Sequence, residues 1–570
     1  MSAAWTPTVL GRALDAAAST RGEADAIVCD AMRLDWRTLR ERVRTTARAM
    51  LALGIGPGER VGILRGNDER WLEVFYAAAL IGAVTVPVNT RFKAAELAHC
   101  LRESECTSLF MVGSFLRIDF IAMLREVLPE VDSGLPGERL PHLERVVIDR
   151  AGSRRGPGGA GGISVAACPG GAPDPAGGGA VPPAALDADF FLALAAQVSE
   201  AALDERARRV SAADLLLIQF TSGTTAFPKG VMLTHDNMLR NAWAAGQRVG
   251  IRSDDRYFNC RPFFHVGGST LSALMALMVG ACLVTLPTFE AGAALEAMAR
   301  ERCTLTSGND TLFQMMMGHP TFSRDRLCLR GGWCAAGPET VRRIMDEMGA
   351  EAICVAYGLS ESSPNVAMSH WQDPREQRIA GRARPLDGLE VRIADTDTGE
   401  EALPPLAAGE IQVRGWAVMR GYCNNPEATA RTFTREGWLR TGDLGTVGKD
   451  GCLQMIGRFK DVFRVGGENV APAEVEEVLL AHPAIATAQV VGVPDARLGE
   501  VAAAYVSLRA GANVQPDDLI EWTRSRCANF RVPRYLRIVA DFESIGMTAS
   551  GKVRKTDLRA HALRELGLAT

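Results

Sequence analysis

The chain has 570 residues, a formal net charge of −4 at pH 7 and 13 cysteines. This length predicts more than one domain with a large core, and the near balance of charges gives no electrostatic basis for binding nucleic acid. The cysteines form no Cys-x-x-Cys pair and no histidine cluster has ligand spacing, so reduced thiols are favoured over disulfides or a zinc site.

The N-terminal part of the chain predicts an α/β fold. Its first residues lack the basic and apolar segments of a signal peptide, which favours a cytoplasmic location. Residues 61–64 form an apolar strand pattern, 69–81 a helix pattern and 84–88 a second strand pattern. A strand–helix–strand unit of this kind indicates a parallel sheet.

A stretch rich in glycine and proline follows at residues 151–183. Of its 33 residues, 17 are glycine or proline, and none is aromatic. Such a composition cannot bury a core, so we expect a disordered insertion at this point.

A polar loop follows the apolar strand expected at residues 215–218. It reads Thr221-Ser222-Gly223-Thr224-Thr225-Ala226-Phe227-Pro228-Lys229-Gly230. The glycines let several backbone N–H groups point at one anion, and the hydroxyls and the ammonium add donors. The loop therefore predicts a triphosphate site, although it lacks the Gly-Lys-Ser/Thr ending of a P-loop.

Residues 262–289 contain no charged side chain apart from the titratable His265 and are numerous enough to span a bilayer. Gly267, Gly268 and Gly280 divide the segment. We therefore expect a buried helix at 269–279 and a buried strand at 282–286 within a large core.

The pattern changes in the last third of the chain. Short alternating runs with Gly and Asp turns between residues 385 and 457 predict a small β-barrel. Beyond it, a helix at 472–480, strands at 486–491 and 501–508, and a helix at 516–527 predict a smaller α/β unit.

Five segments match one family in order and spacing. They are the 221–230 loop, Tyr357-Gly358-Leu359-Ser360-Glu361, Thr441-Gly442-Asp443, the pair Gly457-Arg458-Phe459-Lys460-Asp461 and Gly466-Gly467-Glu468-Asn469-Val470, and the terminal Lys552. Together they resemble the acyl-adenylate-forming enzymes, which comprise acyl-CoA synthetases, adenylation domains of peptide synthetases and luciferase. The resemblance covers nearly the whole chain apart from 151–183.

This resemblance implies an α/β fold with two domains. A large N-terminal domain, residues 1–458, would contain two doubly wound sheets and the small barrel at 385–457. A hinge at 459–460, including Lys460, would join it to a small, mobile C-terminal α/β domain, residues 461–570. No transmembrane segment is implied, and a homodimer is left open.

The resemblance also implies a reaction in two steps. A carboxylate attacks the α-phosphate of ATP to give acyl-AMP and pyrophosphate, and coenzyme A then displaces AMP, with Mg2+ as the metal cofactor. At ~4 Å each pair of like unit charges costs about 1 kcal/mol in water and several times more in a dry site. Fixed cations and donors must therefore offset the repulsion between the carboxylate and the nucleotide.

The family assigns a role to each matching residue. Tyr357 would stack on adenine, Asp443 would accept from both ribose hydroxyls, and Lys552 would bridge the carboxylate and the α-phosphate. Glu361 and Thr224 would hold magnesium, Lys460 would lie at the hinge, and Gly466 and Gly467 would line the coenzyme A channel. The full set of expected ATP- and AMP-binding residues is Thr221, Ser222, Gly223, Thr224, Thr225, Lys229, Ala335, Ala336, Gly337, Tyr357, Gly358, Ser360, Asp443 and Arg458. Lys552, Glu361 and His265 are the expected catalytic residues.

The segment 261–268 resembles the part of the family that lines the acyl pocket. Its histidine, His265, would lie beside the reacting carboxylate, with Phe264 and Gly267 as pocket residues. Trp333 is expected to limit how far the acyl chain penetrates, which favours medium-chain fatty acids or compact ring acids. Trp333 could instead pack in the core. No acidic residue between 262 and 289 could hold a substrate ammonium, so an amino-acid substrate is disfavoured.

Other interpretations remain open at this level. Asp443 could be a turn residue, and Glu361 could be a residue of a helix start. Ala226 and Gly546 depart from the family pattern, where glycine and proline are usual. We therefore expect an ATP-dependent carboxylic acid–CoA ligase, with an acyl-AMP ligase that loads a carrier protein, or a non-catalytic binding protein with the same fold, as alternatives.

Overall fold

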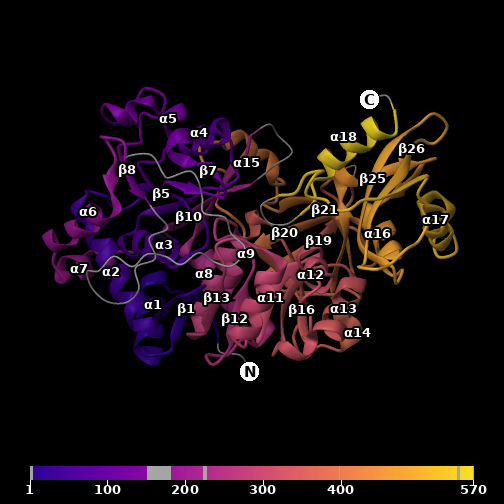
Figure 1. The fold of residues 1–570 in the computed structure, drawn as a ribbon, viewed down its shortest axis with the longest axis horizontal. Coiled ribbons are helices and arrows are strands. Elements are labelled where there is room, and N and C mark those ends of the chain that lie inside the picture. Colours follow the sequence, from indigo (N-terminus) through magenta and orange to yellow (C-terminus); the bar gives the residue numbers. More distant parts are fainter. Residues whose placement is uncertain (1–3, 151–180, 222–226, 397, 549–551, 569–570) are drawn as a thin grey trace.

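The computed structural model describes residues 4–150, 181–221, 227–396, 398–548 and 552–568. Within these residues the chain forms two large, mainly parallel sheets, a four-stranded antiparallel sheet and a separate C-terminal sheet. Figure 1 shows the C-terminal domain, in orange and yellow, beside the larger N-terminal part. An α/β fold with a large domain and a smaller C-terminal one is confirmed.

The first large sheet has seven strands in the order β11-β10-β4-β3-β5-β8-β9. Strands β3 (Arg60–Leu64) and β4 (Val84–Pro87) pair in parallel and are joined by helix α3 (Glu69–Ile81), which confirms the predicted strand–helix–strand unit. Helix α3 begins where the Asp68 side chain accepts from the Trp71 amide, and it ends at Gly82, whose φ of 77° favours glycine. The remaining strands are β5 (Ser108–Val112), β8 (Arg145–Asp149), β9 (Leu186–Asp187), β10 (Leu215–Thr221) and β11 (Lys229–Thr234).

The second large sheet has nine strands in the order β18-β17-β16-β15-β14-β12-β13-β1-β2. Its central strands run in parallel, so their carboxyl ends share one edge. In open α/β sheets this edge is where ligands bind. The parallel strands are β12 (Arg256–Asn259), β13 (Cys282–Thr285), β14 (Leu305–Asn309), β15 (Gly331–Ala335) and β16 (Ala352–Gly358).

The apolar segment around residues 262–289 is largely buried, and its last part is a strand of the nine-stranded sheet. It forms α9 (Val266–Gly268), a π-helical segment Ser269–Leu274, α10 (Met275–Val279) and then β13, in agreement with the predicted helix, turn and strand. No helix in the described part of the chain is both long and apolar enough to cross a membrane. The π-helical turn has no signal in the sequence pattern.

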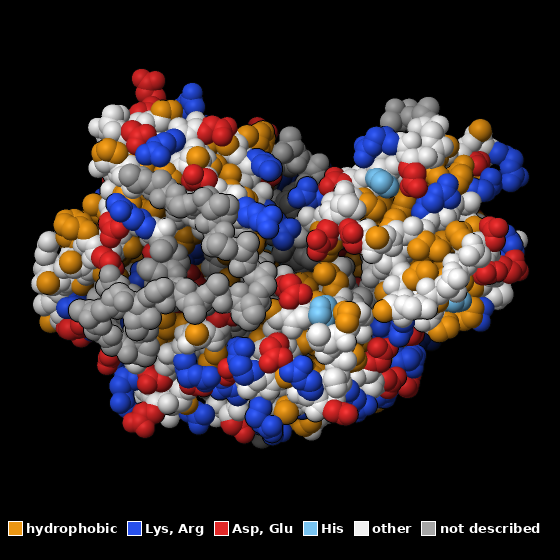
Figure 2. Space-filling model, in the orientation of Figure 1, with side chains coloured by type: hydrophobic (Ala, Val, Ile, Leu, Met, Phe, Trp, Pro, Cys, Tyr) orange, Lys and Arg blue, Asp and Glu red, His pale blue; other side chains and the backbone are white. Residues whose placement is uncertain are grey.

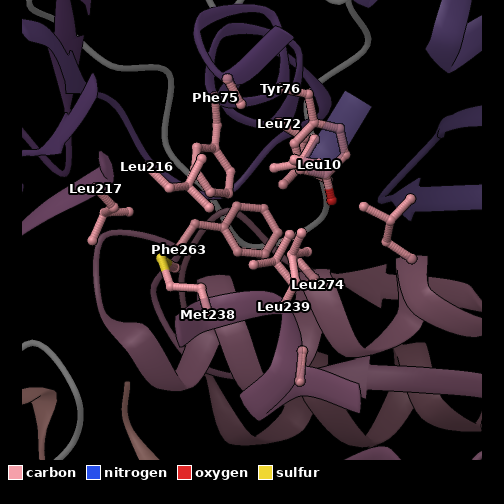
Figure 3. Close-up of a cluster of buried hydrophobic side chains, with 14 of the residues drawn as sticks. Leu10, Leu72, Phe75, Tyr76, Leu216, Leu217, Met238, Leu239, Phe263 and Leu274 are labelled. Atoms are coloured by element: carbon pink, nitrogen blue, oxygen red, sulfur yellow. The ribbon is translucent and has the colours of Figure 1, made fainter. Parts of the chain in front are cut away.

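The main core joins the two large sheets. Helices α3 and α8 (His235–Val249) each contact strands of both sheets, so they form the layer between them. Figure 3 shows Phe263, which precedes His265 by two residues, in the middle of this core. Its labelled neighbours are Leu10, Leu72, Phe75, Tyr76, Leu216, Leu217, Met238, Leu239 and Leu274. Phe263 thus anchors the segment that carries His265.

The region predicted to form a small barrel contains four antiparallel strands. They are β19 (Leu389–Ala394), β20 (Gly409–Gly415), β21 (Leu439–Val447) and β22 (Leu453–Arg458), in that spatial order. The strand pattern is confirmed, and the strands form an open sheet whose edge strands are β19 and β22.

The C-terminal domain has a sheet and a hydrophobic core of its own. Helix α16 (Pro472–Leu480) has the predicted bounds, and α17 (Pro516–Arg524) ends three residues before the predicted one. The strands are β23 (Phe463–Val465), β24 (Glu468–Val470), β25 (Ile485–Asp495), β26 (Gly499–Leu508) and β27 (Tyr535–Ile538), and the last helix is α18 (Lys555–Glu565).

Most of the predicted 151–183 insertion lies outside the described residues. Its last part is described, and Val181 packs against the core beside the seven-stranded sheet. The prediction of disorder is therefore wrong for Val181.

Candidate active site

The predicted site residues gather where three parts of the chain meet. These parts are the carboxyl ends of β14, β15 and β16, the antiparallel strands β21 and β22, and the C-terminal residue Lys552. Figure 2 shows a hollow between the large N-terminal part and the C-terminal domain.

Tyr357, Asp443 and Arg458 form one connected cluster. The Tyr357 hydroxyl donates to Asp443 Oδ2 at 2.9 Å, and Arg458 Nε lies 3.3 Å from Asp443 Oδ1. Asp443 is buried, and this burial raises the pKa of its carboxyl group while the Arg458 charge lowers it. Since the Asp443 carboxylate contacts side chains of β16 and β22, it does more than complete a local turn.

Lys229 and Glu361 both contact Tyr422, a residue with no predicted role. The Tyr422 hydroxyl donates to Glu361 Oε1 at 2.8 Å, and Lys229 Nζ lies 4.9 Å from the centre of the Tyr422 ring. Lys229 pairs with Thr221 where β10 and β11 meet, so the predicted phosphate loop connects these two antiparallel strands. The other predicted loop residues, Ser222, Gly223, Thr224 and Thr225, lie outside the described residues.

The expected adenine-side segment follows strand β15. Ala335 ends the strand, Ala336 follows, and the Gly337 amide donates to Asp310 Oδ1 at 3.0 Å. Asp310 begins helix α12 (Asp310–Met317) immediately after β14, and no motif had indicated it.

Gly358 and Ser360 lie at the end of β16. A Cβ atom at Gly358 would lie 1.9 Å from the Pro364 carbonyl oxygen, so the backbone approach requires glycine. Ser360 and Glu361 begin a 3-10 turn, Ser360–Ser362, which places Glu361 beside Tyr422.

Lys552 belongs to the C-terminal domain but its ammonium group faces the large domain. Burial, the largest effect, and the charges of Arg261 and Arg458 together lower the pKa of Lys552 to about 8, while Asp443 and Asp310 oppose this shift. The residue as a whole keeps exposed surface. In turn, the charge of Lys552 lowers the pKa of His265, Asp310 and Asp443, so each of these groups lies within electrostatic range of Lys552.

The His265 ring is held by a backbone amide two residues further along the chain. The Gly267 amide donates to His265 Nδ1 at 3.0 Å, and burial together with the charges of Arg261 and Lys552 lowers the pKa of His265 to about 3. The ring is therefore neutral at pH 7. Because Nδ1 accepts a hydrogen bond, the proton is on Nε2, which leaves Nε2–H as a donor.

Trp333 packs against Arg261, the first residue of the segment that carries His265. Its side chain is 3% exposed, and its indole N–H donates to the Tyr257 hydroxyl at 2.7 Å and to the Leu271 carbonyl at 3.2 Å. The Arg261 guanidinium carbon lies 4.3 Å from the centre of the Trp333 ring. A Cβ at Gly267 would lie 3.1 Å from Arg261 Nη1, and Phe264 is also buried, with its carbonyl accepting from Gln219.

The residues expected to line the coenzyme A channel lie apart from this cluster. Gly467 is exposed in the turn between β23 and β24, and nothing lies within 4 Å of where its Cβ would be. The Gly466 amide donates to the Leu498 carbonyl within the C-terminal domain. Lys460 is exposed in a 3-10 turn, Phe459–Asp461.

Glu477 makes a domain contact that the sequence did not indicate. It lies on α16, and its Oε2 accepts from the Glu339 amide at 3.0 Å, in the first turn of helix α13 (Pro338–Met348) of the large domain. A Cβ at Gly337 would lie 1.7 Å from Glu477 Oε1, so glycine makes room for this carboxyl group. Burial, together with Asp310, Glu339 and Glu476, raises the pKa of Glu477 to about 8.

Comparison with known proteins identifies this arrangement. Residues 14–423 match the model of the AMP-binding enzyme family, and residues 474–552 match the model of the AMP-binding enzyme C-terminal domain. The chain belongs to the AMP-binding enzyme family. The resemblance inferred from the five motifs is thereby confirmed.

Individual relatives of this AMP-binding enzyme match it over nearly its whole length. A 3-[(3aS,4S,7aS)-7a-methyl-1,5-dioxo-octahydro-1H-inden-4-yl]propanoyl:CoA ligase of Rhodococcus jostii (strain RHA1) is 35% identical over 97% of this chain and 98% of its own. The mitochondrial medium-chain acyl-CoA ligase ACSF2 of Mus musculus is 33% identical over 98% of this chain and 88% of its own. The crystal structure of the anthranilate CoA ligase AuaEII in complex with anthranoyl-AMP has a TM-score of 0.82 at 23% identity and covers 99% of both chains.

These matches establish the reaction class. The chain is an AMP-forming acyl-CoA synthetase, which uses ATP to join a carboxylic acid to coenzyme A through an acyl-AMP.

Proposed function

We propose that this AMP-binding enzyme activates a medium-chain fatty acid or a compact ring acid and transfers it to free coenzyme A. The observation that carries the assignment of the site is the position of Lys552, which comes from the other domain to lie near His265, Asp310 and Asp443. The acid class is supported by two of the relatives, one of which takes a ring-bearing propanoate and the other medium-chain acids.

The first half-reaction needs positive charge between the acid and the α-phosphate. Lys552 is the group in this arrangement that would supply it, and it must be protonated to do so. Neutral His265 would donate through Nε2–H to the reacting carboxylate and hold it in place without adding charge.

The nucleotide would be held by groups on both sides of the cleft. The buried Asp443 carboxylate, oriented by Tyr357 and Arg458, would accept from the ribose hydroxyls, and Ala335, Ala336 and Gly337 would lie along the adenine. Lys229, beside Tyr422, would meet the outer phosphates.

Magnesium fits the donor set around Glu361. Tyr422 donates to Glu361 Oε1, and no hydrogen bond from a described residue uses Oε2, so one oxygen remains for a hard cation. Among the described residues, no group of three or more His, Cys, Asp or Glu could hold a metal ion. Magnesium at Glu361 would neutralise phosphate charge. Thr224, the second proposed ligand, lies outside the described residues.

The test is a panel of carboxylic acids with ATP and Mg2+, read by pyrophosphate release. We expect release with medium-chain and ring acids and thioester formation when free coenzyme A is added. Release that yields no thioester with free coenzyme A would instead indicate a carrier protein as acceptor. If none of the acids in the panel causes pyrophosphate release, the proposed substrate class is wrong.

A further inference from the structure

Arg261 is a buried cation at the acid-binding end of the site. The residue is 4% exposed and lies between the end of β12 and the segment that carries His265. Its guanidinium group stacks on Trp333, and its charge lowers the pKa of both His265 and Lys552. A Cβ at Gly267 would lie 3.1 Å from Arg261 Nη1, so the guanidinium group lies directly beside the segment that is proposed to line the acyl pocket.

The described residues give the Arg261 side chain no hydrogen-bond acceptor. Its Nε and Nη2 atoms are buried without a hydrogen-bond partner among the described residues, and no aspartate or glutamate is among the groups that act on its pKa. Burial lowers the pKa of Arg261, and the groups that oppose this shift are the Cys260 thiol, the Tyr257 phenol and the Cys334 thiol. Tyr257 is already engaged, since its hydroxyl donates to Leu271 O and accepts from Trp333 and Ser272.

An arrangement of this kind is costly for the unliganded protein. A buried charge is normally paired and hydrogen-bonded, because desolvation is not otherwise offset. The stacked Trp333 ring stabilises the cation, but a ring face cannot accept along the directions of the guanidinium N–H bonds. The planar guanidinium group is suited to an oxygen acceptor that arrives with the substrate.

We propose that Arg261 determines substrate specificity by binding a second oxygen acceptor of the acid, a ketone or a second carboxylate, beyond the carboxylate that reacts. This inference rests on the proposed function and narrows its acid class. In the proposed function the reacting carboxylate would have Lys552 and the Nε2–H of His265 as partners, which would leave Arg261 for another group. Trp333 sets the position of the guanidinium and thereby the distance between the two acceptors.

The experiment compares matched acids that differ in the second acceptor. The pairs are hexanoate with adipate and cyclohexanecarboxylate with 4-oxocyclohexanecarboxylate, and kcat/KM is measured by pyrophosphate release. We expect the wild type to prefer at least one acid with the second acceptor by about 10- to 100-fold, the range for a hydrogen bond to a charged group. Arg261→Met should remove this preference while kcat/KM for the acid without a second acceptor stays the same or rises. Arg261→Lys should keep part of the preference.

Arg240→Met is the matched control, because Arg240 stacks on Trp416 at 4.4 Å outside the site and should leave the preference unchanged. The inference is overturned if the wild type uses both members of each pair equally, a result that does not depend on whether any variant folds. It is also overturned if kcat/KM of a folded Arg261→Met falls to the same extent for all acids, since the guanidinium group would then bind the reacting carboxylate. Turnover of plain acids without any preference would contradict this inference alone, whereas no turnover of any acid would contradict the proposed function.

Discussion

At the scale of single residues, the proposed role of Lys552 makes the first half-reaction depend on the protonation of this residue. Its pKa is about 8, below the ordinary value of 10.5, so the charged form is lost as pH rises through 8. We expect kcat/KM for acyl-AMP formation, which reports the free enzyme, to fall above pH 8. A pyrophosphate-release assay between pH 6 and 10 measures this fall.

Lys552→Arg tests the origin of that decline. A guanidinium group keeps its charge far above pH 8, so the residual activity of this variant should decline at higher pH than that of the wild type. The same decline in both proteins would assign it to another group.

Tyr422 is a second residue whose role can be tested. Its hydroxyl donates to Glu361, while its ring faces Lys229, so Tyr422→Phe removes one contact and keeps the other. We expect the Mg2+ concentration for half-maximal pyrophosphate release to rise by about 10-fold, in line with a lost hydrogen bond to a charged group. Tyr505→Phe is the control, since Tyr505 makes the same kind of contact with Glu565 within the C-terminal domain. Equal Mg2+ requirements in wild type and Tyr422→Phe would contradict the proposed metal role of Glu361.

The sequence predicted site residues only where they belong to recurring motifs. Tyr357, Asp443 and Lys552 could be identified in this way, and Tyr357 and Asp443 do form a contact. Tyr422 and Asp310 could not, because each is a single residue that belongs to no motif. Tyr422 comes 61 residues after its partner Glu361, and Asp310 comes 27 residues before its partner Gly337, so only folding brings each pair together. The lack of a partner for Arg261 is likewise a property of the packed structure.

At the scale of elements, local signals determined which predictions were accurate. Helix α3 matches its expected bounds because Asp68 caps its start and Gly82 ends it, and α16 matches because proline occupies its first position. The π-helical segment Ser269–Leu274 could not be predicted, since it arises from packing in the core between the large sheets. The open arrangement of β19 to β22 depends on long-range pairing, which alternating runs do not specify.

The contact between α16 and α13 should make domain docking depend on pH. The pKa of Glu477 is about 8 in the docked arrangement and returns toward its ordinary value of 4.5 when the C-terminal domain moves away. Because the docked form binds the extra proton, docking should be strongest at acidic pH and weaken as pH rises from about 4.5 to 8. Asp310, Glu339 and Glu476 surround the same carboxyl group and act in the same direction.

Hydrogen exchange at the first turn of α13 measures this docking. We expect protection, corrected for the intrinsic rate, to fall between pH 5 and 8 in the wild type and to change much less in Glu477→Gln, which keeps an acceptor without a charge. The first turn of α8 is the internal control, since Thr234 of the same domain caps it. An equal fall in both proteins would show that Glu477 does not control docking.

At the scale of the whole molecule, the order of the motifs predicted two domains but not how they are arranged. Domain interfaces are small and polar compared with cores, so a sequence pattern gives little information on their geometry. In this arrangement the charge of Lys552 acts on Asp443 and Asp310, which belong to the proposed nucleotide site, while Gly467 faces open space. We infer that this arrangement of the domains serves the first half-reaction. The C-terminal domain would then turn about the region of Lys460 for the second half-reaction.

This division of labour predicts opposite defects in two variants. Lys552→Ala should slow acyl-AMP formation by on the order of 10²–10³, as expected when one preorganised charge is lost, and should spare thioester formation from supplied acyl-AMP. Gly467→Leu should do the reverse, because a side chain would obstruct the coenzyme A channel once the domain has turned. The φ of Gly467 is +97°, which strains any other residue, so Gly467→Ala serves as the control with the same strain and little bulk. If Gly467→Ala and Gly467→Leu lose activity equally in both half-reactions, Gly467 acts through its turn alone. If Lys552→Ala and Gly467→Leu show the same defect, the two half-reactions do not use separate arrangements of the domains.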